Sequence, residues 1–304
     1  MQQQNKAYIF AISAVLLWST VATAFNIALQ YVDYMQLLLF ASGIATLIML
    51  AIVALEGKLH LAFSSSPKEL FQSAIRGFLN PFVYYLILIK AYDVLPAQEA
   101  MTLNYTWPIM LTLLSIPLLK QKLSKKGFIA VLVSFVGVLL IASGGDITNL
   151  KFTNIKGDLL VLFTAIIWAL FWIVNLRSKQ DESVKLLQSF FFGFLFTIPV
   201  VAIFSDFIIP TNEGLLAVTY IGFAEMGITF FFWLMALKLS KRTDQVSQLI
   251  YFSPFLSLIF ISIFLNEEIQ ISTIYGLMFI LGGILINKGE RAPDSNREEK
   301  GEGD

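Results

Sequence analysis

The sequence predicts an all-α polytopic membrane protein, with ten transmembrane helices arranged as two inverted five-helix repeats around a central cavity. Hydrophobic residues make up 57% of the 304 residues and charged residues only 14%, whereas a typical soluble domain carries about 25% charged residues. The apolar residues gather into runs long enough to cross a hydrocarbon core of roughly 30 Å. Lys and Arg concentrate in alternate connectors between these runs, as expected for a chain that crosses a membrane repeatedly.

Ten apolar runs are expected to span the bilayer. The first is longer than the ~7–15-residue apolar core of a signal peptide, and no small-residue cleavage site separates it from the second, so we expect a retained helix. Short connectors suit antiparallel neighbours and leave no room for a soluble domain. The charged segment 289–304 is expected to be a disordered cytoplasmic tail. The ten runs are 7–29, 35–55, 71–92, 96–119, 127–144, 157–177, 186–206, 214–237, 244–265 and 271–288.

The distribution of positive charge predicts the orientation. If the helix count is even, 18 of the 21 Lys and Arg residues fall at the two termini and in one set of alternate connectors, and only Lys90, Lys151 and Lys156 fall on the other side. Positive residues accumulate on the cytoplasmic side of membrane proteins. We therefore expect both termini to be cytoplasmic, in an integral protein of a bacterial inner (cytoplasmic) membrane.

The two halves of the chain resemble each other at an offset of 145–150 residues. Trp18 of "AVLLWST" corresponds to Trp168 of "AIIWALF", and two further segment pairs follow the same register: "GFLNPFVYYLILIKA" with "GFAEMGITFFFWLMA", and "NYTWPIML" with "IYFSPFLS". Five helices are an odd number, so the second half must be inverted relative to the first. The predicted repeats are residues 1–144 and 145–288, an arrangement found in many secondary transporters.

These segments resemble the drug/metabolite transporter superfamily, specifically its EamA-type ten-helix members. The resemblance rests on the Trp18 and Trp168 segments, on "SPFLSLIFISIFLNEEI" with its Pro-centred helix and acidic connector, and on "GLMFILGGILI", a Gly-rich closing helix. The first half has the Lys-rich "KQK" where the family has an acidic connector. The resemblance implies a cavity lined by helices 1, 3, 4, 6, 8 and 9, with helices 5 and 10 at the periphery. It also implies transport of small organic solutes, very often export.

Glu225 is the candidate residue of greatest interest. It lies about eleven residues into the eighth run, roughly 16 Å deep at 1.5 Å per residue, in "YIGFAEMGITFFFWLMALK". A charged carboxylate near the midplane costs about 2.5–3.5 kcal/mol on insertion scales, and such residues usually serve function. Glu225 can serve as a proton relay that is protonated in one access state and ionised in another, or it can hold a cationic group of the solute. The alternative is a protonated acid that simply bonds a neighbouring helix.

Other polar residues are expected near the same cavity. Asn80 corresponds to Glu225 in the repeat and precedes Pro81, which either frees a carbonyl for a ligand or merely kinks the helix. Glu99 lies near the outer end of the fourth run, where it either pairs with Lys90 or belongs to an outer gate. Asn104, in the same run, needs a hydrogen-bond partner, so we expect it to face the cavity.

Aromatic residues are expected to supply the apolar part of the site. Trp18, Trp107 and Trp168 lie deep in their runs, where their faces can stack on an apolar solute or attract a cation. Tyr84, Tyr251 and Thr229 are weaker candidates on the same argument. Glycines in the fifth and tenth runs are expected to allow close approach of these two helices; they are Gly137, Gly282 and Gly283.

Composition argues against several other classes of protein. The chain has no Cys and a single His, which argues against a metal site, and no cofactor is expected. Net charge is zero, so no general attraction to nucleic acid is expected. "SGGD" lacks the lysine of a phosphate-binding loop, so ATP is not the expected energy source.

The predicted function is therefore a secondary active transporter, an exporter of amino acids, metabolites or cationic or aromatic compounds, working by alternating access with protons as a possible coupling ion. The alternatives are a membrane-embedded enzyme acting on lipid-linked substrates, or a channel or facilitator. The expected partners are a small-molecule solute and the lipid bilayer. The sequence does not distinguish a monomer from a homodimer.

Overall fold

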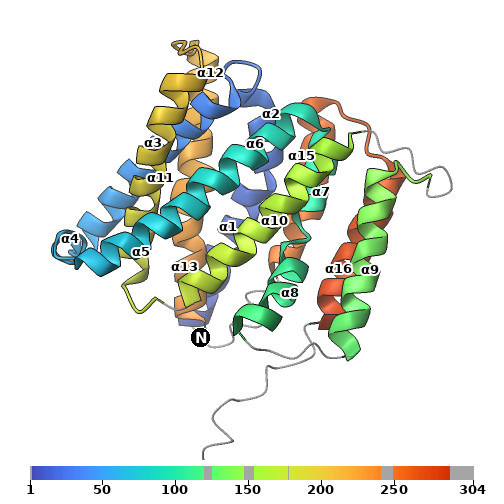
Figure 1. The fold of residues 1–304 in the computed structure, drawn as a ribbon, viewed down its shortest axis with the longest axis horizontal. Coiled ribbons are helices and arrows are strands. Elements are labelled where there is room, and N and C mark those ends of the chain that lie inside the picture. Colours follow the sequence, from blue (N-terminus) through green and yellow to red (C-terminus); the bar gives the residue numbers. More distant parts are fainter. Residues whose placement is uncertain (1, 120–124, 147–153, 177, 241–248, 288–304) are drawn as a thin grey trace, which may run out of the picture.

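Every regular element that the structure describes is a helix. The computed structural model describes residues 2–119, 125–146, 154–176, 178–240 and 249–287, and its helices form a single bundle (Figure 1). They follow the ten predicted apolar runs closely, so the all-α polytopic fold is confirmed. In chain order, spans 1 to 10 are α1 (Gln2–Ser19) with α2 (Val21–Ala28); α3 (Tyr34–Leu55); α5 (Pro67–Gly77) with η1 (Phe78–Val83) and α6 (Tyr84–Val94); α7 (Ala97–Asn104) with α8 (Trp107–Leu119); α9 (Lys125–Ala142); α10 (Ile155–Leu176); α11 (Glu182–Phe204); α12 (Asn212–Tyr220) with η2 (Ile221–Ile228) and α13 (Thr229–Leu239); η3 (Leu249–Phe252) with α15 (Ser253–Leu265); and α16 (Ile271–Asn287).

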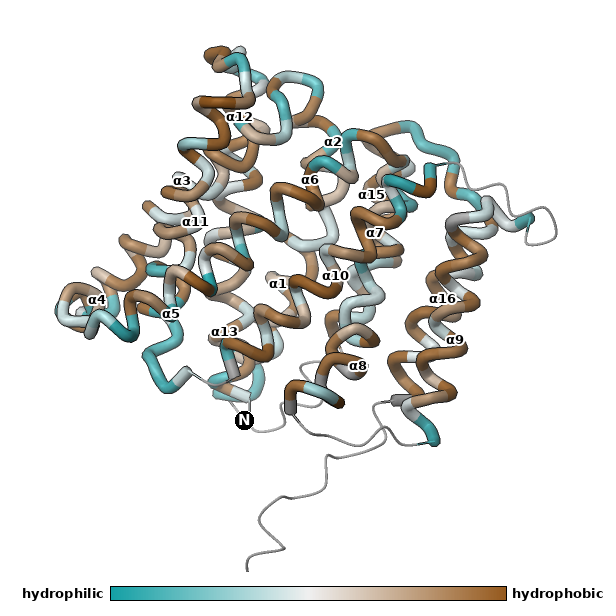
Figure 2. The backbone as a smooth tube through the Cα atoms, viewed as in Figure 1, coloured by the Kyte–Doolittle hydropathy of each residue, from teal (hydrophilic) through white to brown (hydrophobic). Residues whose placement is uncertain are grey.

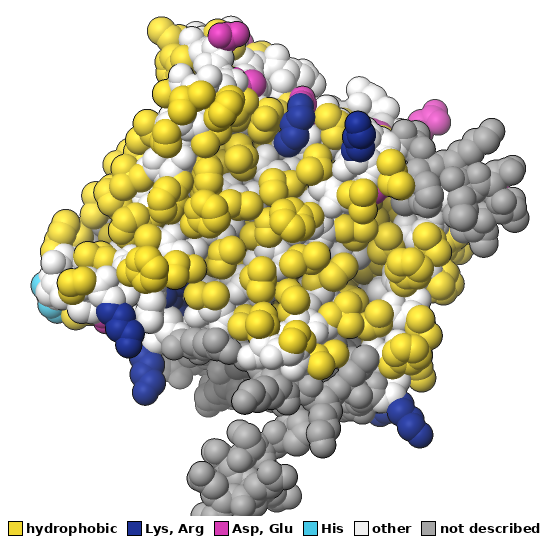
Figure 3. Space-filling model, in the orientation of Figure 1, with side chains coloured by type: hydrophobic (Ala, Val, Ile, Leu, Met, Phe, Trp, Pro, Cys, Tyr) yellow, Lys and Arg dark blue, Asp and Glu magenta, His cyan; other side chains and the backbone are white. Residues whose placement is uncertain are grey.

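The outer surface of the bundle is suited to lipid. Six of the described spans are long and apolar enough to cross a membrane by length and composition alone, and spans 9 and 10 are shorter apolar helices. Hydrophobic residues form a broad belt around the middle of the helical bundle (Figure 2). Charged side chains lie mainly at the two ends of the face seen in Figure 3. Because lipid solvates apolar side chains but no backbone polar group, helices are the elements expected here.

Local capping residues define where several spans begin. The Asp33 side chain accepts hydrogen bonds from the backbone N–H groups of Met35 and Gln36 at the start of α3. Ser66 and Glu69 form a reciprocal capping box at the start of α5, and Asp181 caps α11. Each cap satisfies N–H groups that have no partner within the helix. The short helix α4 (Leu59–Phe63) lies in the connector between spans 2 and 3.

Five spans, namely 1, 3, 4, 8 and 9, change helical geometry along their length and are called interrupted below, although spans 1, 3 and 8 each continue as one helix of 26, 28 and 28 residues. Span 1 breaks between α1 and α2, where the hydroxyl of Ser19 donates to the carbonyl oxygen of Val15 at 2.6 Å. Span 4 breaks between α7 and α8, where the hydroxyl of Thr106 donates to the carbonyl oxygen of Leu103 at 2.8 Å. Span 9 starts with the 3₁₀ turn η3. Side-chain hydroxyls that replace backbone donors allow such breaks within a membrane.

The other two interruptions differ in kind: span 3 kinks within η1, and span 8 has the wider turns of a π helix in η2. In η1, Asn80 adopts extended backbone angles (φ −149°, ψ 121°) immediately before Pro81, so the helix bends there as the kink alternative predicted. In η2, the hydroxyl of Thr229 donates to the carbonyl oxygen of Ala224, five residues earlier, which stabilises the wider turn. The two π segments begin at 78 and 221, near the offset of the sequence repeat. Isolated π turns frequently occur at functional sites.

Helices α9 and α16 pack closely against each other, apart from most of the bundle (Figure 1). A Cβ atom at Gly137 would lie 2.5 Å from the carbonyl oxygen of Gly276, and a Cβ atom at Gly283 would lie 2.6 Å from that of Ala130. The predicted role of Gly137 and Gly283 in close helix approach is confirmed. The same prediction is wrong for Gly282, because a Cβ atom there would meet nothing within 4 Å.

The division into inverted repeats, residues 1–144 and 145–288, stays a proposal. It is supported by the recurrence of π segments in spans 3 and 8 and of breaks in spans 4 and 9. The predicted tail, residues 289–304, lies outside the described residues.

Candidate solute-binding cavity

A cavity of about 450 Å³ lies inside the bundle. Its lining residues come from spans 1, 3, 4, 6, 8 and 9, which are the six helices that the family resemblance implied. Five of these six spans are the interrupted ones and span 6 is continuous, so the interruptions surround the cavity. The volume falls within the ~300–1,000 Å³ range of small-molecule sites.

Glu225 lines this cavity from the π segment of span 8. The hydroxyl of Tyr85, on span 3, donates to Oε1 of Glu225 at 2.7 Å. Oε2 of Glu225 is buried and has no hydrogen-bond partner among the described residues. The carboxyl group is therefore held on one oxygen, and the second oxygen remains available to a ligand, a proton or water.

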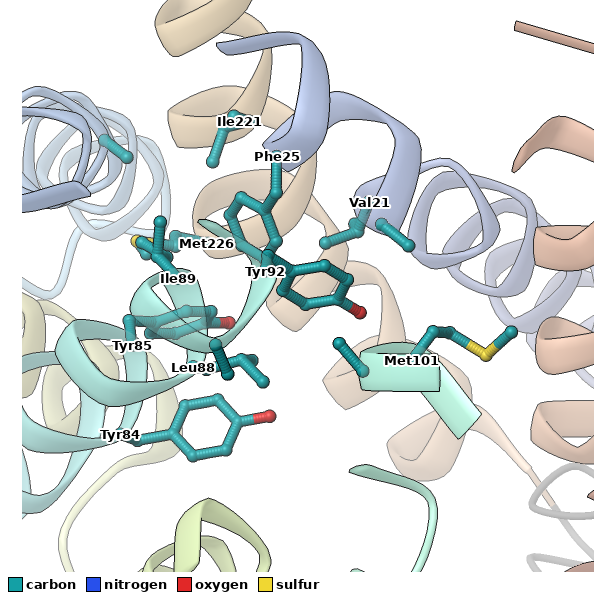
Figure 4. Close-up of a cluster of buried hydrophobic side chains, with 14 of the residues drawn as sticks. Val21, Phe25, Tyr84, Tyr85, Leu88, Ile89, Tyr92, Met101, Ile221 and Met226 are labelled. Carbon is teal, nitrogen blue, oxygen red and sulfur yellow. The ribbon is translucent and has the colours of Figure 1, made fainter. Parts of the chain in front are cut away.

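Tyr84, the residue before Tyr85, makes a different polar contact. The amide Nδ2 of Asn104, on α7, donates to the hydroxyl oxygen of Tyr84 at 3.0 Å. The hydroxyl groups of Tyr84 and Tyr92 point to the same side of α6 (Figure 4). The expectation that Asn104 faces the cavity and has a partner is confirmed by its place in the lining and by this bond.

Aromatic rings form much of the cavity wall around Trp168. The ring of Tyr84 lies 4.7 Å from that of Trp168 between centroids, and the ring of Trp107 lies 6.5 Å from it. Trp18 contacts Trp233 at a centroid distance of 5.6 Å. Such an aromatic wall offers flat, polarisable surface to an apolar or aromatic body and a negative ring face to a cation.

Two further unpartnered polar atoms occur among the lining residues. The indole Nε1 of Trp172 and the hydroxyl oxygen of Ser257 are buried, line the cavity, and have no hydrogen-bond partner in the described part of the chain. Buried polar groups in proteins nearly always have a partner. Together with Oε2 of Glu225, they offer one N–H donor, one hydroxyl and one carboxyl oxygen to a bound molecule.

The structure gathers seven of the ten sequence-predicted residues around this one cavity: Trp18, Tyr84, Asn104, Trp107, Trp168, Glu225 and Tyr251. Three residues do not line it. Asn80 is buried at the bend of η1, with its Oδ1 unpartnered among the described residues, and Thr229 bonds the backbone of its own helix. Glu99 is also buried away from the cavity, and Lys90 pairs with Asp93 at 2.6 Å instead of with Glu99. That these ten residues bind or couple the solute stays a prediction.

Sequence reasoning missed three polar residues near this site. Trp172 follows Trp168 by four residues, so helical spacing placed it on the same face. Ser257 follows Pro254 by three residues on span 9, where the same spacing applies. No sequence signal marked Tyr85, because the π segment before it changes which side of the helix it faces. Among the described residues, no group of three or more acidic or His side chains is placed to hold a metal ion.

A lipid-facing helical bundle whose interrupted spans enclose a mixed polar and aromatic cavity is the architecture of a polytopic membrane transporter. The chain belongs to the EamA-like transporter family, because the sequence profile of that family matches residues 5–143 and again residues 155–288. The chain is therefore a transporter of the drug/metabolite transporter superfamily and not an enzyme.

Individual relatives agree with this assignment. An uncharacterized transporter of Archaeoglobus fulgidus is 23% identical over 94% of this chain and 99% of its own length. The uncharacterized transporter YoaV of Bacillus subtilis is 24% identical over 93% and 96% of the two chains. The aromatic amino acid exporter YddG of Ancylobacter novellus is 24% identical over 77% and 80%. A solved crystal structure shares the fold, with a TM-score of 0.67 and 22% identity over 93% of this chain and 96% of the other.

Proposed function

We propose that this chain is a secondary active transporter that exports small organic solutes by alternating access. The observation that carries the proposal is Glu225, a carboxyl group with one unpartnered oxygen in an aromatic cavity. Secondary transporters bind their substrates near the midplane, between repeats, where helices are discontinuous. The non-helical backbone at Asn80 in span 3 and the π turns in span 8 support this, because they lie in two spans that line the cavity.

The cavity chemistry favours one kind of solute. The free oxygen of Glu225 suits an ammonium or another hydrogen-bond donor, and the indole N–H of Trp172 suits an acceptor such as a carboxylate or carbonyl. The wall of Trp168, Tyr84 and Trp107 suits a flat apolar body. Amino acids, amine-bearing metabolites and cationic aromatic compounds combine these features. The aromatic amino acid exporter among the relatives supports this class.

Glu225 is also the proposed coupling residue. A carboxyl group in low-dielectric surroundings favours either a bound proton or a bound cationic group over a free negative charge. A proton and a cationic solute would then compete for the same oxygen, so that release of the solute on one side follows proton binding there. This exchange would couple export to proton entry.

Alternating access requires contacts that close one side of the cavity. In the proposed orientation, the start of α7 faces outside, and Nε2 of Gln98 donates to the carbonyl oxygen of Glu268 at 2.9 Å. The backbone N–H of Gln270 donates to Oε1 of Gln98 at 2.9 Å. These bonds join span 4 to the connector between spans 9 and 10, so they would hold the outer ends of the two halves together until the protein opens outward.

Transport by purified protein in proteoliposomes tests the proposal. Counterflow of radiolabelled solutes from a panel of amino acids, amines and aromatic cations would be measured with and without an imposed pH gradient. We expect counterflow of at least one cationic or zwitterionic aromatic solute, acceleration by the pH gradient, and loss of that acceleration in Glu225→Gln. Glu213→Gln, which alters an exposed acid at the start of α12, is the matched control and should behave as wild type.

Three outcomes would contradict parts of the proposal. Flux that never shows counterflow would indicate a channel, and counterflow that no pH gradient accelerates would indicate a facilitator. Full proton-driven transport by Glu225→Gln would remove the coupling role of this residue, and an unchanged solute preference in the same variant would also remove its binding role.

We further propose a bacterial inner-membrane location with both termini in the cytoplasm. The proposal is supported by the excess of Lys and Arg on one side of the predicted topology. It fixes which end of the cavity faces the cytoplasm, and therefore which end an exported solute enters.

A further inference from the structure

Two buried acids lie outside the solute cavity. Glu99, on α7 in span 4, and Asp158, on α10 in span 6, are 7% and 4% exposed. The two side chains are near enough for each to affect the ionisation of the other. Oε1 of Glu99 and both carboxyl oxygens of Asp158 have no hydrogen-bond partner among the described residues. Neither acid is used by the proposed solute site.

The backbone around them holds the two helices together. Nδ2 of Asn154 donates to the carbonyl oxygen of Val94 at 3.1 Å. A Cβ atom at Gly157 would lie 2.7 Å from the Leu95 side chain, so glycine is needed for this approach. The first turn of α10 therefore packs directly against the turn that leads into α7 and against α7 itself, which brings the segments that carry Asp158 and Glu99 together.

Helix capping does not account for either acid. At the start of α10, Oδ1 of Asn154 already accepts the backbone N–H of Gly157 at 3.1 Å. At the start of α7, the carboxylate of Glu267 accepts the N–H groups of Ala97 and Gln98 at 3.2 and 3.3 Å. Because other residues supply the caps, Glu99 and Asp158 are not required to be anions at helix N-termini.

Among the described residues, neither Lys90 nor Lys156 is paired with Glu99 or Asp158. Lys90 is bound to Asp93 and lies over the ring of Tyr34, and Lys156, two residues before Asp158, is exposed. Glu267, in the connector packed against α7, adds a third negative charge that acts on Glu99. Two buried carboxyl groups close together, with no cation beside them in the described part of the chain, strongly disfavour ionisation of both at once.

We propose that Glu99 and Asp158 form a proton-binding site, in which one proton is shared between the two carboxyl groups and joins span 4 to span 6. The proton lies on one carboxyl oxygen and donates to the other, so the pair carries one negative charge instead of two. Such a pair titrates as a unit. The site is separate from Glu225 and does not depend on its proposed role.

Because of its position, protonation of the pair should affect the opening of the outer side. The pair lies beside the cap that Glu267 places on α7, at the end of the bundle proposed to face outside. If the ends of α7 and α10 separate, water reaches both carboxyl groups, and each can ionise. Proton binding then favours the closed arrangement over the open one, by linkage. A rise in pH on that side should favour opening.

Infrared spectroscopy of the purified, solute-free protein tests the site. Wild type should show a carboxylic-acid C=O band that disappears as pH rises, and both Glu99→Gln and Asp158→Asn should lose that band. Glu213→Gln, at an exposed acid, should keep it, and Glu225→Gln should keep it as well. A band that survives in both Glu99→Gln and Asp158→Asn would overturn the proposal.

A double variant tests the proposal if the two single-substitution proteins do not fold. The exchange variant Glu99→Asp/Asp158→Glu keeps two carboxyl groups in the pair and should retain a titrating C=O band shifted from that of wild type. If this folded variant shows no such band, the proposal fails. Neither readout uses a solute, so failure of the transport proposal would leave the result unaffected.

Discussion

Tyr85 and Glu225 meet across the bundle although 140 residues separate them in the chain: the phenol Oη of Tyr85 donates to Oε1 of Glu225 at 2.7 Å. Span 3 belongs to the first half of the chain and span 8 to the second. The bond therefore fixes the acid of one half against the helix of the other, and Oε2 of this cavity-lining residue has no hydrogen-bond partner among the described residues. Any motion that separates the halves at this depth must break or replace it.

Tyr85→Phe should destabilise the protein. The change removes the partner of Oε1 without altering the ring, so Glu225 would have no protein partner on either oxygen. Leaving a buried acceptor unsatisfied costs about 1–3 kcal/mol, and thermal unfolding in detergent should show a lower midpoint. Tyr92→Phe is the matched control. Tyr92 is also buried, but its hydroxyl makes no hydrogen bond to a described residue. Equal midpoints for the two variants would show that the Tyr85 bond is not stabilising.

Trp168 should contribute to affinity for flat solutes. Its ring contacts Tyr84 and Trp107 within the cavity wall, and Phe230 behind it. Favourable aromatic pairs are worth about 0.5–1.5 kcal/mol, so Trp168→Phe should weaken binding of an aromatic solute about two- to tenfold, and Trp168→Ala more. Equilibrium binding to purified protein measures this directly. Phe191→Leu, on the lipid-exposed face of α11, should leave affinity unchanged, and a similar loss there would point to a general folding defect.

Much of this fold could be predicted because the membrane makes hydropathy decisive. The bounds of each apolar run predicted the bounds of the corresponding helix; for example, the predicted run 35–55 differs by one residue from α3. Part of the cavity followed from the repeat, which paired Trp18 with Trp168, and both line it. Glu225 followed from the high energy of a carboxylate in hydrocarbon.

The remaining parts of the site depend on geometry that the sequence does not express. The extended backbone at Asn80 and the π turns around it change the angular phase of span 3. As a result Asn80 does not line the cavity, and Tyr85 reaches Glu225. Of the two alternatives for Glu99, the pair with Lys90 is wrong, because Lys90 pairs with Asp93, and the gate stays a proposal in which its neighbour Asp158 comes from span 6. Contacts between distant spans of this kind cannot be derived from periodicity within one helix.

Alanine substitutions should have opposite effects on stability at two glycines of the α9–α16 pair, one in close contact with the other helix and one facing open space. Gly137→Ala would push a methyl group against the carbonyl oxygen of Gly276, and overpacking of this kind costs about 1–3 kcal/mol. Gly282→Ala meets nothing within 4 Å and should gain about 0.5–1 kcal/mol from reduced backbone entropy. Thermal unfolding midpoints should therefore move in opposite directions. Equal shifts would contradict the close contact between the helices.

Cysteine labelling should establish the proposed orientation. The chain contains no native Cys, so single substitutions need no background correction. Lys68→Cys and Glu213→Cys place thiols at exposed positions near the starts of α5 and α12, on opposite sides of the predicted topology. In intact cells, a membrane-impermeant maleimide should label Glu213→Cys and leave Lys68→Cys unlabelled until the cells are permeabilised. The reverse pattern would invert the orientation and, with it, the direction in which the cavity faces.

Glu267 should help to hold the outer side of the cavity closed. Its carboxylate accepts the backbone N–H groups of Ala97 and Gln98, so a side chain from the connector after span 9 caps the start of α7. A negative charge at a helix N-terminus is worth about 0.3–1 kcal/mol, and somewhat more when partly buried. Glu267→Ala should therefore raise the population of the outward-open state by about two- to fivefold. A cysteine placed at Met101, in the cavity lining, should then react faster with a maleimide added from outside.

The neighbouring acid provides the control for this prediction. Glu268 accepts Nε2 of Gln98 through its backbone carbonyl oxygen and not through its side chain. Glu268→Ala therefore removes one negative charge from the same connector but leaves that hydrogen bond in place, and the labelling rate at position 101 should stay at the wild-type value. If both variants accelerate labelling equally, the effect comes from the charge of the connector and the capping contact has no part in closing the outer side.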